Sequence, residues 1–292
     1  MSTLKIAIQK SGRLNTDSLN LLKECGIKIS NGKDQLKVTS SNFPIEIFYL
    51  RNSDIPQYIE DGVVDAGIIG ENTILEKGKN IQVIQKLGFS KCRVSLAVTK
   101  DIDNPSIDFF RGKRIATSYP NTLNQYLETN GIQAETHIIS GSVEIAPNIG
   151  LADAVCDIVS SGSTLFRNGL KEAQVILQSE AVLAKSPSLS ESQQQILDKL
   201  LFRIQAVLRA KTTKYILLNV PNEKIQAVSD ILPVLKSPTI LPLVQEGWSS
   251  LHSVIQEDEF WDVLDQLNDA GAEDILVVPI DKMIALNYKP KK

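Results

Sequence analysis

The chain has 292 residues, of which 42% are hydrophobic and 22% are charged, and its formal net charge is -3 at pH 7. This is ordinary usage for a globular enzyme or binding protein of two or three domains, and it gives no global reason to expect a nucleic-acid or membrane partner. No run of about 18 apolar residues occurs, and the chain enters its first predicted strand almost at once, so we expect a cytoplasmic protein.

The first part of the chain predicts an α/β lobe, in which short apolar strands alternate with amphipathic helices. The predicted strands are 5–8, 35–38, 45–50 and 66–69, and the predicted helices are 17–25 and 55–60. We expect the strands 35–38 and 45–50 to form a hairpin. A long strand at 93–99 then crosses into a second lobe, whose own first strand is 114–117.

A serine-rich stretch, 179–192, leads from the second lobe into a long amphipathic helix. Ser190 and Gln193 have the spacing of a capping box, and the apolar residues that follow recur with the helical period. We assign this helix back to the first lobe. The predicted domains are 1–96 with 180–213 for lobe I, 97–179 for lobe II, and 214–292 for a third domain.

The third domain has a pattern of its own, in the order strand, helix, strand, strand, helix, strand. The predicted strands are 215–220, 239–243, 249–255 and 275–279, and the predicted helices are 223–235 and 258–270. This order is that of a ferredoxin-like βαββαβ unit.

Two segments resemble each other closely enough to predict that lobes I and II arose by duplication. Without gaps, Asp61–Gly70 aligns with Asp153–Gly162 at both aspartates, one valine and the glycine. The first helix of each lobe is followed by a Gly-Ile pair, at Gly26 and Gly131, where glycine suits a left-handed C-cap. Two such lobes place the loops after their strands across a shared cleft, where open α/β sheets bind ligands.

The turn after the second copy, Ser160-Ser-Gly-Ser-Thr164, is a candidate anion site. Unpaired amides at a helix start carry partial positive charge, and small residues let a phosphate approach the backbone. For this turn alone, an ordinary capped helix after a strand remains the alternative.

Several other chemistries are disfavoured by the residues that the chain lacks. Three widely spaced cysteines, Cys25, Cys92 and Cys156, argue against a disulfide framework or a zinc knuckle. Two histidines, His137 and His252, lie in different predicted domains, which argues against a catalytic triad, a Cys-His dyad or a histidine-based metal site. The sequence contains neither a P-loop nor a Gly-x-Gly-x-x-Gly motif. A polar cleft without an obvious nucleophile suits a transfer between two bound substrates.

Seven segments in this order carry a resemblance that runs over essentially the whole chain: Ile8–Leu14, Asp65–Asn72, Cys92–Ala97, Lys113–Pro120, Gly141–Pro147, Gly150–Asp157 and Ser237–Pro242. They resemble the long form of ATP phosphoribosyltransferase, the first enzyme of histidine biosynthesis. The resemblance implies an α/β fold with a two-lobed catalytic part like a type II periplasmic binding protein. It also implies a C-terminal ACT-like domain that binds histidine as a feedback inhibitor.

The resemblance implies a Mg²⁺-dependent reaction of ATP with 5-phosphoribosyl 1-diphosphate that gives N1-(5-phosphoribosyl)-ATP and diphosphate. Anionic side chains near the ribose and cations near the diphosphate both favour such a displacement. The candidate catalytic residues are Lys10, Arg13, Arg51, Glu144 and Asp157. The candidate substrate-binding residues are Ser11, Gly12, Glu71, Asn72, Arg93, Tyr119, Ser160, Ser161, Gly162, Ser163 and Thr164.

Within these sets, the turn 160–164 is expected to hold the ribose 5-phosphate, and Asp157 to accept hydrogen bonds from ribose hydroxyls. The cationic residues suit the diphosphate and the ATP phosphates, because guanidinium groups match phosphate oxygens in bidentate geometry. Glu71, Asn72 and Tyr119 are candidates for contact with ATP, although Tyr119 could instead be a core aromatic. We expect Mg²⁺ to be held through the substrate diphosphate rather than by a protein metal site.

The regulatory expectations rest on the resemblance alone. It places histidine loosely among four residues of the third domain, Asn219, Thr239, Leu241 and Ser253. It also implies a homo-oligomer, from dimer to hexamer, with AMP as a further candidate inhibitor. Two alternatives remain at this stage, a non-catalytic solute-binding protein and an amino-acid sensor with inactive lobes.

Overall fold

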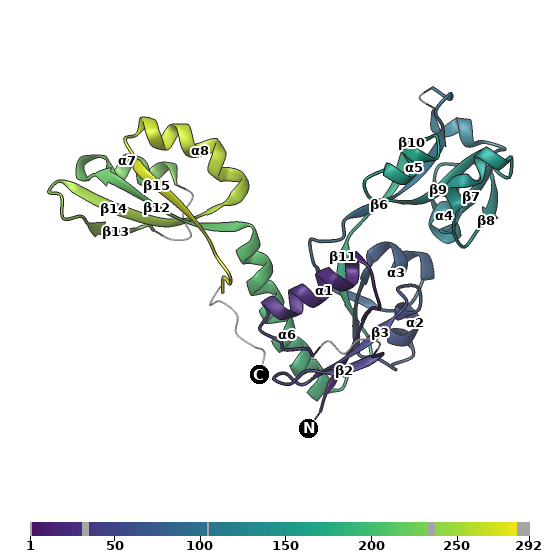
Figure 1. The fold of residues 1–292 in the computed structure, drawn as a ribbon, viewed down its shortest axis with the longest axis horizontal. Helices are drawn as coiled ribbons and strands as arrows, with labels where there is room; N and C mark the ends of the chain where they lie inside the picture. The colour runs from purple at the N-terminus through teal and green to yellow at the C-terminus, as the bar shows by residue number, and fades with distance from the viewer. Residues whose placement is uncertain (1, 31–34, 104, 233–236, 285–292) are drawn as a thin grey trace. The chain divides into compact units, whose positions relative to one another are not determined.

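The computed structural model describes residues 2–30, 35–103, 105–232 and 237–284. The chain divides into two compact units, Met1–Asp198 and Lys199–Lys292. Figure 1 shows the helices and strands of both units, coloured along the chain. Over the described ranges, no helix is long and apolar enough to cross a membrane.

Lobe I of the first unit is built on a six-stranded sheet with the order β2-β3-β1-β4-β11-β5. Its strands are β1 (Leu4–Gln9), β2 (Lys37–Thr39), β3 (Ile45–Leu50), β4 (Ala66–Gly70), β5 (Gln82–Lys86) and β11 (Ala181–Lys185), and its helices are α1 (Arg13–Glu24), α2 (Ile55–Glu60) and α3 (Glu71–Lys77). The predicted hairpin is confirmed, because β2 pairs antiparallel with β3. Helix α1 begins four residues earlier than predicted, directly after Gly12.

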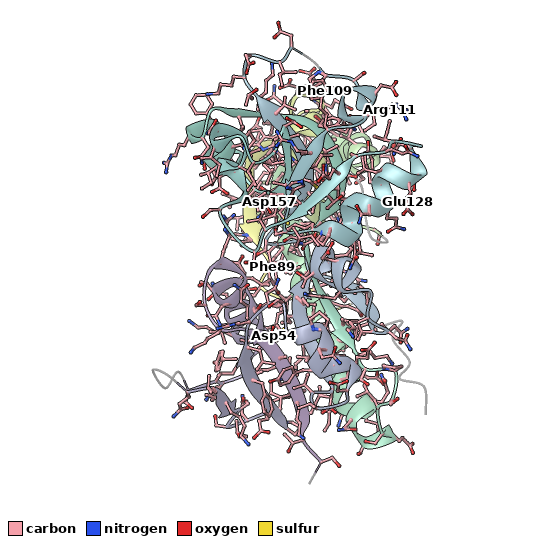
Figure 2. All side chains as sticks on the ribbon, turned by 90° about the vertical axis from the view of Figure 1, so that its right-hand side faces the viewer. Asp54, Phe89, Phe109, Arg111, Glu128 and Asp157 are labelled. Atoms are coloured by element: carbon pink, nitrogen blue, oxygen red, sulfur yellow. The ribbon has the colours of Figure 1, made fainter. Side chains whose placement is uncertain are left out.

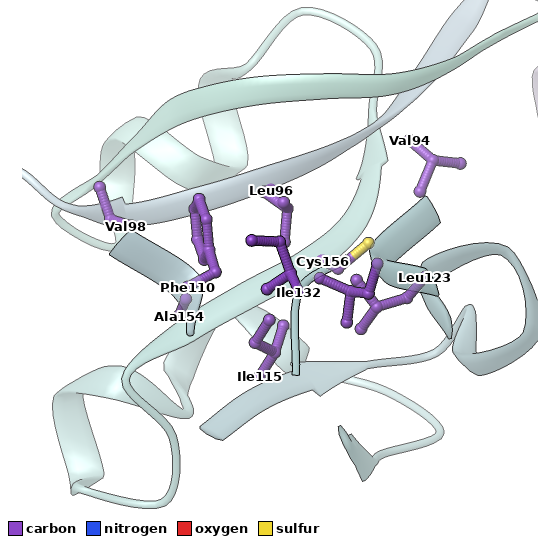
Figure 3. Close-up of a cluster of buried hydrophobic side chains, with 10 residues drawn as sticks. Val94, Leu96, Val98, Phe110, Ile115, Leu123, Ile132, Ala154 and Cys156 are labelled. Carbon is purple, nitrogen blue, oxygen red and sulfur yellow. The ribbon is translucent and has the colours of Figure 1, made fainter. Parts of the chain in front are cut away.

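Lobe II has a five-stranded sheet with the order β10-β6-β9-β7-β8. Its strands are β6 (Cys92–Thr99), β7 (Arg114–Thr117), β8 (Glu135–Ile138), β9 (Ala154–Val159) and β10 (Leu170–Ser179), with helices α4 (Pro120–Thr129) and α5 (Ser163–Arg167) and short 3₁₀ turns η1 (Ile107–Phe110), η2 (Val143–Ile145) and η3 (Pro147–Ile149). Figure 3 shows the core on one face of this sheet, where Phe110 and Leu123 pack against strand residues such as Leu96 and Cys156.

The sheet topology confirms the internal duplication. In lobe I the order β3-β1-β4-β11-β5 matches the order β8-β7-β9-β6-β10 in lobe II. The strand directions match as well, because the first three strands of each set are mutually parallel and the last two pairings are antiparallel. This shared order in two lobes joined by crossover strands is the type II periplasmic-binding-protein-like arrangement.

The register of the duplication differs from the gapless alignment. The amide of Lys5 donates to Asp65 Oδ2 at 2.7 Å, and the amide of Arg114 donates to Asp153 Oδ2 at 2.9 Å. Asp65 therefore corresponds to Asp153, where each carboxylate ties the start of one strand to its parallel neighbour. The expected match of Asp65 with Asp157 is wrong by four residues.

With this corrected register, lobe II contains additional residues before helix α5. Helix α3 begins six residues after Asp65, whereas α5 begins ten residues after Asp153, so lobe II carries four extra residues at this point. These residues include Ser160 to Gly162, the first part of the candidate anion turn. This first part of the turn therefore has no counterpart in lobe I, whereas Ser163 and Thr164 correspond to the start of α3.

Two crossings connect the lobes. Strand β6 spans the boundary expected at 96/97, yet it lies whole in the lobe II sheet, next to β9 and β10. The return crossing falls between Ser179, the last residue of β10, and Ala181, the first residue of β11. We therefore propose that the boundaries between lobe I and lobe II lie between β5 and β6 and between Ser179 and Ala181.

The predicted capping box at the start of helix α6 (Glu191–Lys211) is confirmed. The Ser190 amide donates to Gln193 Oε1 at 3.0 Å, and the Gln193 amide donates to Ser190 Oγ at 3.3 Å. Gln193 also donates from Nε2 to Asp65 Oδ1 at 2.7 Å, which fixes the start of α6 to lobe I. Burial raises the pKa of Asp65 despite these bonds.

The third domain has the predicted βαββαβ order and a four-stranded antiparallel sheet, β13-β14-β12-β15. Its elements are β12 (Thr213–Pro221), η4 (Asn222–Lys224), α7 (Ile225–Ile231), β13 (Thr239–Pro242), β14 (Trp248–Gln256), α8 (Glu257–Asp269) and β15 (Glu273–Pro279). The predicted helix end at 235 lies outside the described residues. Both helices cover one face of the sheet, over a core that includes Ile216, Leu218 and Leu251.

Candidate functional site

A cavity of about 290 Å³ lies between lobes I and II. Lobe I contributes Gln9, Arg13 and Asn72 to its lining, and lobe II contributes Tyr119 and Ser160. These residues follow the carboxyl ends of parallel strands, as the ligand sites of open α/β sheets do. Figure 2 shows the neighbouring Asp157 on the side of lobe II that faces lobe I. The duplicated strand ends thus form one polar cleft, as predicted.

The candidate anion turn leaves backbone amides without a partner in the helix that follows, although the Ser163 amide donates to Ser161 Oγ at 3.4 Å. The first helical hydrogen bond of α5 runs from the Phe166 amide to the Gly162 carbonyl at 3.0 Å, so the amides before it have no partner within the helix. Gly162 has φ +78°, a left-handed conformation that glycine adopts at little cost. Ser161 and Ser163 hydrogen bond to each other at 3.0 Å between their Oγ atoms. The turn is exposed at Ser160, Ser161, Ser163 and Thr164.

Asp157 lies at the end of β9 and is held in a defined orientation. Its Oδ1 accepts hydrogen bonds from Ser118 Oγ at 3.0 Å and from the Ile158 amide at 2.8 Å. Burial raises the pKa of this carboxyl above its usual value, and the charge of Glu144 adds to the rise. Both of these hydrogen bonds end on Oδ1, so Oδ2 is the oxygen available to a ligand.

Two arginines converge on Ser160, one from helix α1 of lobe I and one from strand β6 of lobe II. Arg13, at the start of α1 in lobe I, reaches Ser160 Oγ with Nη1 at 3.3 Å. Arg93, on β6, donates from Nη1 to the Ser160 carbonyl at 3.1 Å and from Nε to Glu172 at 2.7 Å. Arg13 therefore places a positive charge beside the candidate anion turn, whereas the charge of Arg93 is partly compensated by Glu172.

The remaining predicted cations lie at the ends of two neighbouring strands in lobe I. Lys10 follows β1 and Arg51 follows β3, and the Lys10 amide donates to the Leu50 carbonyl at 2.7 Å, which holds the two strand ends together. Both side chains are exposed. Gly12, between Ser11 and α1, has φ +89° and lets the chain turn into the helix.

Asn72 and Tyr119 meet across the cleft. Asn72 Nδ2 donates to the Tyr119 hydroxyl at 3.0 Å, and Asn72 Oδ1 accepts from Ser179 Oγ at 3.0 Å. Burial raises the pKa of Tyr119 to about 12, so its phenol stays protonated at neutral pH. Glu71, by contrast, pairs with Lys86 at 3.2 Å, so its charge is already partly compensated within lobe I.

Sequence reasoning missed several polar groups of the cleft. Asn52 donates from Nδ2 to Thr73 Oγ1 at 2.8 Å, while its Oδ1 is buried and has no hydrogen-bond partner within the part of the chain that the structure describes. Ser90 and Cys92, on the crossing segment, also line the cavity. Asn52 follows Arg51 at the end of a predicted strand, so its position in the sequence was the available signal.

The four residues expected to bind histidine do not share one surface. Thr239 pairs with His252, and Leu241 and Asn219 both pair with Ser250, which places these side chains on the sheet face opposite the helices. Ser253 pairs with the core residue Ile216 and so lies on the helix-covered face. Asn219 Nδ2 donates to Asp274 Oδ2 at 3.1 Å.

The donor set offers little to a resident metal ion. Within the described ranges, no three His, Cys, Asp or Glu side chains gather closely enough to hold one. His137 is paired with Glu135, and His252 with Tyr215 and Ser250. The isolated carboxylates near the anion turn fit an ion that is bound mainly through substrate phosphates.

A two-lobed α/β fold with an anion turn, converging arginines and a fixed carboxylate defines an enzyme that acts on phosphorylated sugars or nucleotides. The ATP phosphoribosyltransferase family model matches residues 51–206, and the model of the HisG C-terminal domain matches residues 210–282. The chain belongs to the ATP phosphoribosyltransferase family of histidine biosynthesis, in its long form.

Individual relatives agree with this assignment. The ATP phosphoribosyltransferase of Cytophaga hutchinsonii is 56% identical over 285 residues, covering 97% of this chain and 100% of the relative. That of Phocaeicola vulgatus is 53% identical over 281 residues, covering 96% and 99%. A solved ATP phosphoribosyl transferase (HisG:HisZ) complex from Thermotoga maritima is similar with 30% identity and a TM-score of 0.59, covering 70% of this chain and 99% of that chain.

Proposed function

We propose that the cleft between lobes I and II transfers the 5-phosphoribosyl group of 5-phosphoribosyl 1-diphosphate to N1 of ATP and releases diphosphate. The bond from C1 of the ribose to the diphosphate oxygen breaks, and a bond from C1 to adenine N1 forms with the electron pair of that nitrogen. The observation that carries the proposal is the convergence of Arg13 and Arg93 on Ser160, which lines the inter-lobe cavity and is the first residue of the turn 160–164.

Each lobe has a separate role in this proposal. In lobe II, the backbone amides at the start of α5 hold the ribose 5-phosphate, and Asp157 Oδ2 accepts hydrogen bonds from the ribose hydroxyls. The carboxylate also stabilises the positive charge that builds on the sugar as the diphosphate leaves. In lobe I, Lys10, Arg13 and Arg51 bind the diphosphate and the ATP phosphates, because these cations follow neighbouring strand ends.

The adenine end of ATP is assigned to the opposite part of the cavity. Asn72 and Tyr119 hydrogen bond across the cleft, and the unpaired Oδ1 of Asn52 suits the exocyclic amino group of adenine. The Asn52 amide is oriented by Thr73, and because its Oδ1 is buried, this acceptor meets the adenine amino group only when the residues that cover it move. Glu71 is a weaker candidate here, because it is paired with Lys86.

We also propose Mg²⁺ dependence, with the ion bound through the substrate diphosphate and with Asp157 and Glu144 as the protein carboxylates nearest to that role. When bound, the ion neutralises charge on the leaving diphosphate. The protein supplies the orientation of both substrates and excludes water between the lobes.

Feedback inhibition by histidine is proposed for the third domain. Asn219, Thr239 and Leu241 on the open sheet face are the candidates that share a surface, and Ser253 does not join them. Inhibition requires a coupling free energy between this face and the cleft, and assembly into a homo-oligomer supplies one physical route. AMP competition at the ATP site is a related proposal, as is a cytoplasmic location.

One assay tests the reaction and the regulation together. The near-ultraviolet absorbance is followed with ATP, 5-phosphoribosyl 1-diphosphate, Mg²⁺ and pyrophosphatase, with and without histidine. We expect a rise that needs both substrates and is suppressed by histidine. A rise that ignores histidine refutes the regulatory proposal, and a folded protein that gives no rise refutes the proposed transfer and favours an inactive sensor.

A further inference from the structure

We propose that Glu76, a residue outside the lining of the cavity that contains Arg13 and Ser160, positions the Ser118–Asp157 pair by capping a helix of the opposite lobe. Glu76 lies on α3 of lobe I, near its end, and only 7% of its surface is exposed. The proposal rests on the proposed ribose site of lobe II, because Asp157 is the group that Glu76 is inferred to place.

The contacts of Glu76 all cross from lobe I to the first turn of α4 in lobe II. Its Oε1 accepts from the Asn121 amide at 3.0 Å, and its Oε2 accepts from the Thr122 amide at 2.9 Å and from Thr122 Oγ1 at 2.8 Å. The Glu76 carbonyl accepts from Asn121 Nδ2 at 2.8 Å. Four hydrogen bonds therefore join one residue of α3 to two residues of α4.

These contacts replace a cap that α4 lacks in its own lobe. The N-cap residue Tyr119 makes no side-chain capping bond, and the first helical residue, Pro120, has no N–H group. The first bond within the helix is that of the Leu123 amide to the Tyr119 carbonyl, at 3.0 Å. Only the amides of Asn121 and Thr122 remain to be satisfied, and Glu76 takes both. A carboxylate at a helix N-terminus is further favoured by the helix dipole.

The capped turn carries the groups that reach the site. Ser118 and Tyr119 immediately precede α4, and Ser118 Oγ orients Asp157 while the Tyr119 hydroxyl accepts from Asn72. Asn72 and Glu76 are four residues apart, so they share one face of α3. Helix α3 thus holds both sides of the Ser118–Tyr119 turn against lobe I. Loss of the cap frees this turn and the hydrogen bond that orients Asp157.

The test compares three variants of the full chain, Glu76→Ala, Glu76→Gln and Glu60→Ala. Glu60 is the matched control, because it is also a lobe I carboxylate that accepts a backbone amide, from Asn80 at 3.0 Å, and pairs with Lys79 at 2.9 Å, both within its own lobe. Hydrogen exchange is measured on peptides that cover 118–123, and kcat and KM are measured for both substrates.

We expect at least tenfold faster exchange of the two amides and at least a tenfold lower kcat in Glu76→Ala, with a thermal midpoint close to that of Glu60→Ala. Glu76→Gln keeps one acceptor oxygen, so its exchange rate and kcat should be intermediate. If Glu76→Ala does not fold, the comparison is made with Glu76→Gln instead. A kcat within twofold of Glu60→Ala overturns the positioning role, as does unchanged exchange of the two amides. Asp157→Asn is measured in parallel. If Asp157→Asn abolishes turnover and Glu76→Ala does not, only the inference about Glu76 fails. If Asp157→Asn has no effect on turnover, the proposed ribose site itself fails.

Discussion

Replacing Asp157 by asparagine should abolish most of the activity without a loss of stability. The Oδ1 of the substituted asparagine can still accept from Ser118 and from the Ile158 amide. Its Nδ2, however, replaces the carboxylate oxygen that is proposed to accept from the ribose hydroxyls. A hydrogen bond to a charged group contributes about 1.5–3 kcal/mol. At about 1.4 kcal/mol per factor of ten, its loss lowers kcat/KM for 5-phosphoribosyl 1-diphosphate by roughly 10- to 150-fold.

Although Asp157→Asn should lower the activity, it should not lower the thermal stability. Burial raises the pKa of Asp157, so the folded state is favoured by protonation of this carboxyl and penalised when it ionises at neutral pH. An uncharged asparagine removes that penalty, so the thermal midpoint should stay the same or rise. By the same linkage, activity should fall on the acid side at a higher pH than an ordinary aspartate would give.

Asp153→Asn supplies the matched control from the start of the same strand. Asp153 binds the Arg114 guanidinium and amide, and these bonds lower its pKa to about 2. This variant should lose stability and keep its kinetic constants. Melting curves and initial rates for both variants test whether Asp157→Asn loses activity but not stability, and Asp153→Asn loses stability but not activity. If Asp157→Asn melts well below the wild type, or keeps its kcat/KM within threefold, the assignment of Asp157 to the ribose is refuted.

Three further results are expected. Gly162→Ala places a side chain at φ +78°, which costs about 1–2 kcal/mol, and should raise the KM for 5-phosphoribosyl 1-diphosphate. The control Gly150→Ala, at φ +73° in the same lobe, should melt earlier with an unchanged KM. Equal KM values in the two variants contradict the anion turn. Tyr119→Phe removes a neutral hydrogen bond of about 0.5–1.5 kcal/mol, so the KM for ATP should rise about two- to tenfold in steady-state kinetics, and a change confined to the other substrate argues against the assignment. Acid titration of unfolding should show that the Asp153–Arg114 pair stabilises the fold above the ordinary pKa of 3.8 and stops doing so as the pH falls through about 2; Asp153→Asn should lack this component.

Strongly periodic elements were predictable from the sequence. Helix α2 and strand β6 match their predicted ranges almost residue for residue, and the left-handed conformations of Gly26 and Gly131 follow from the Gly-Ile pairs that end α1 and α4. Strands β5, β8, β10 and β11 were not predicted. Strand β11 is a short apolar run buried between two neighbouring strands, so it lacks the alternation that marks a half-buried strand.

The candidate site was predictable where it follows strand ends and unpredictable where it depends on contact between the lobes. Asp157 and the turn after it could be found because strand, serine and glycine lie together in the sequence. Glu76 could not be found in this way, because its partners Asn121 and Thr122 are more than 40 residues away along the chain. The register of the duplication also needed the structure, because Asp153 and Asp157 both offer a plausible match to Asp65.

The most direct test of the account is a crystal structure of the chain with 5-phosphoribosyl 1-diphosphate and Mg²⁺. We predict the 5-phosphate on the amides of the turn 160–164, a ribose hydroxyl within hydrogen-bond distance of Asp157, and the diphosphate directed toward Arg13 and Lys10. A 5-phosphate bound at the Ser11–Gly12 turn of lobe I, or outside the cleft, would contradict the division of roles between the lobes.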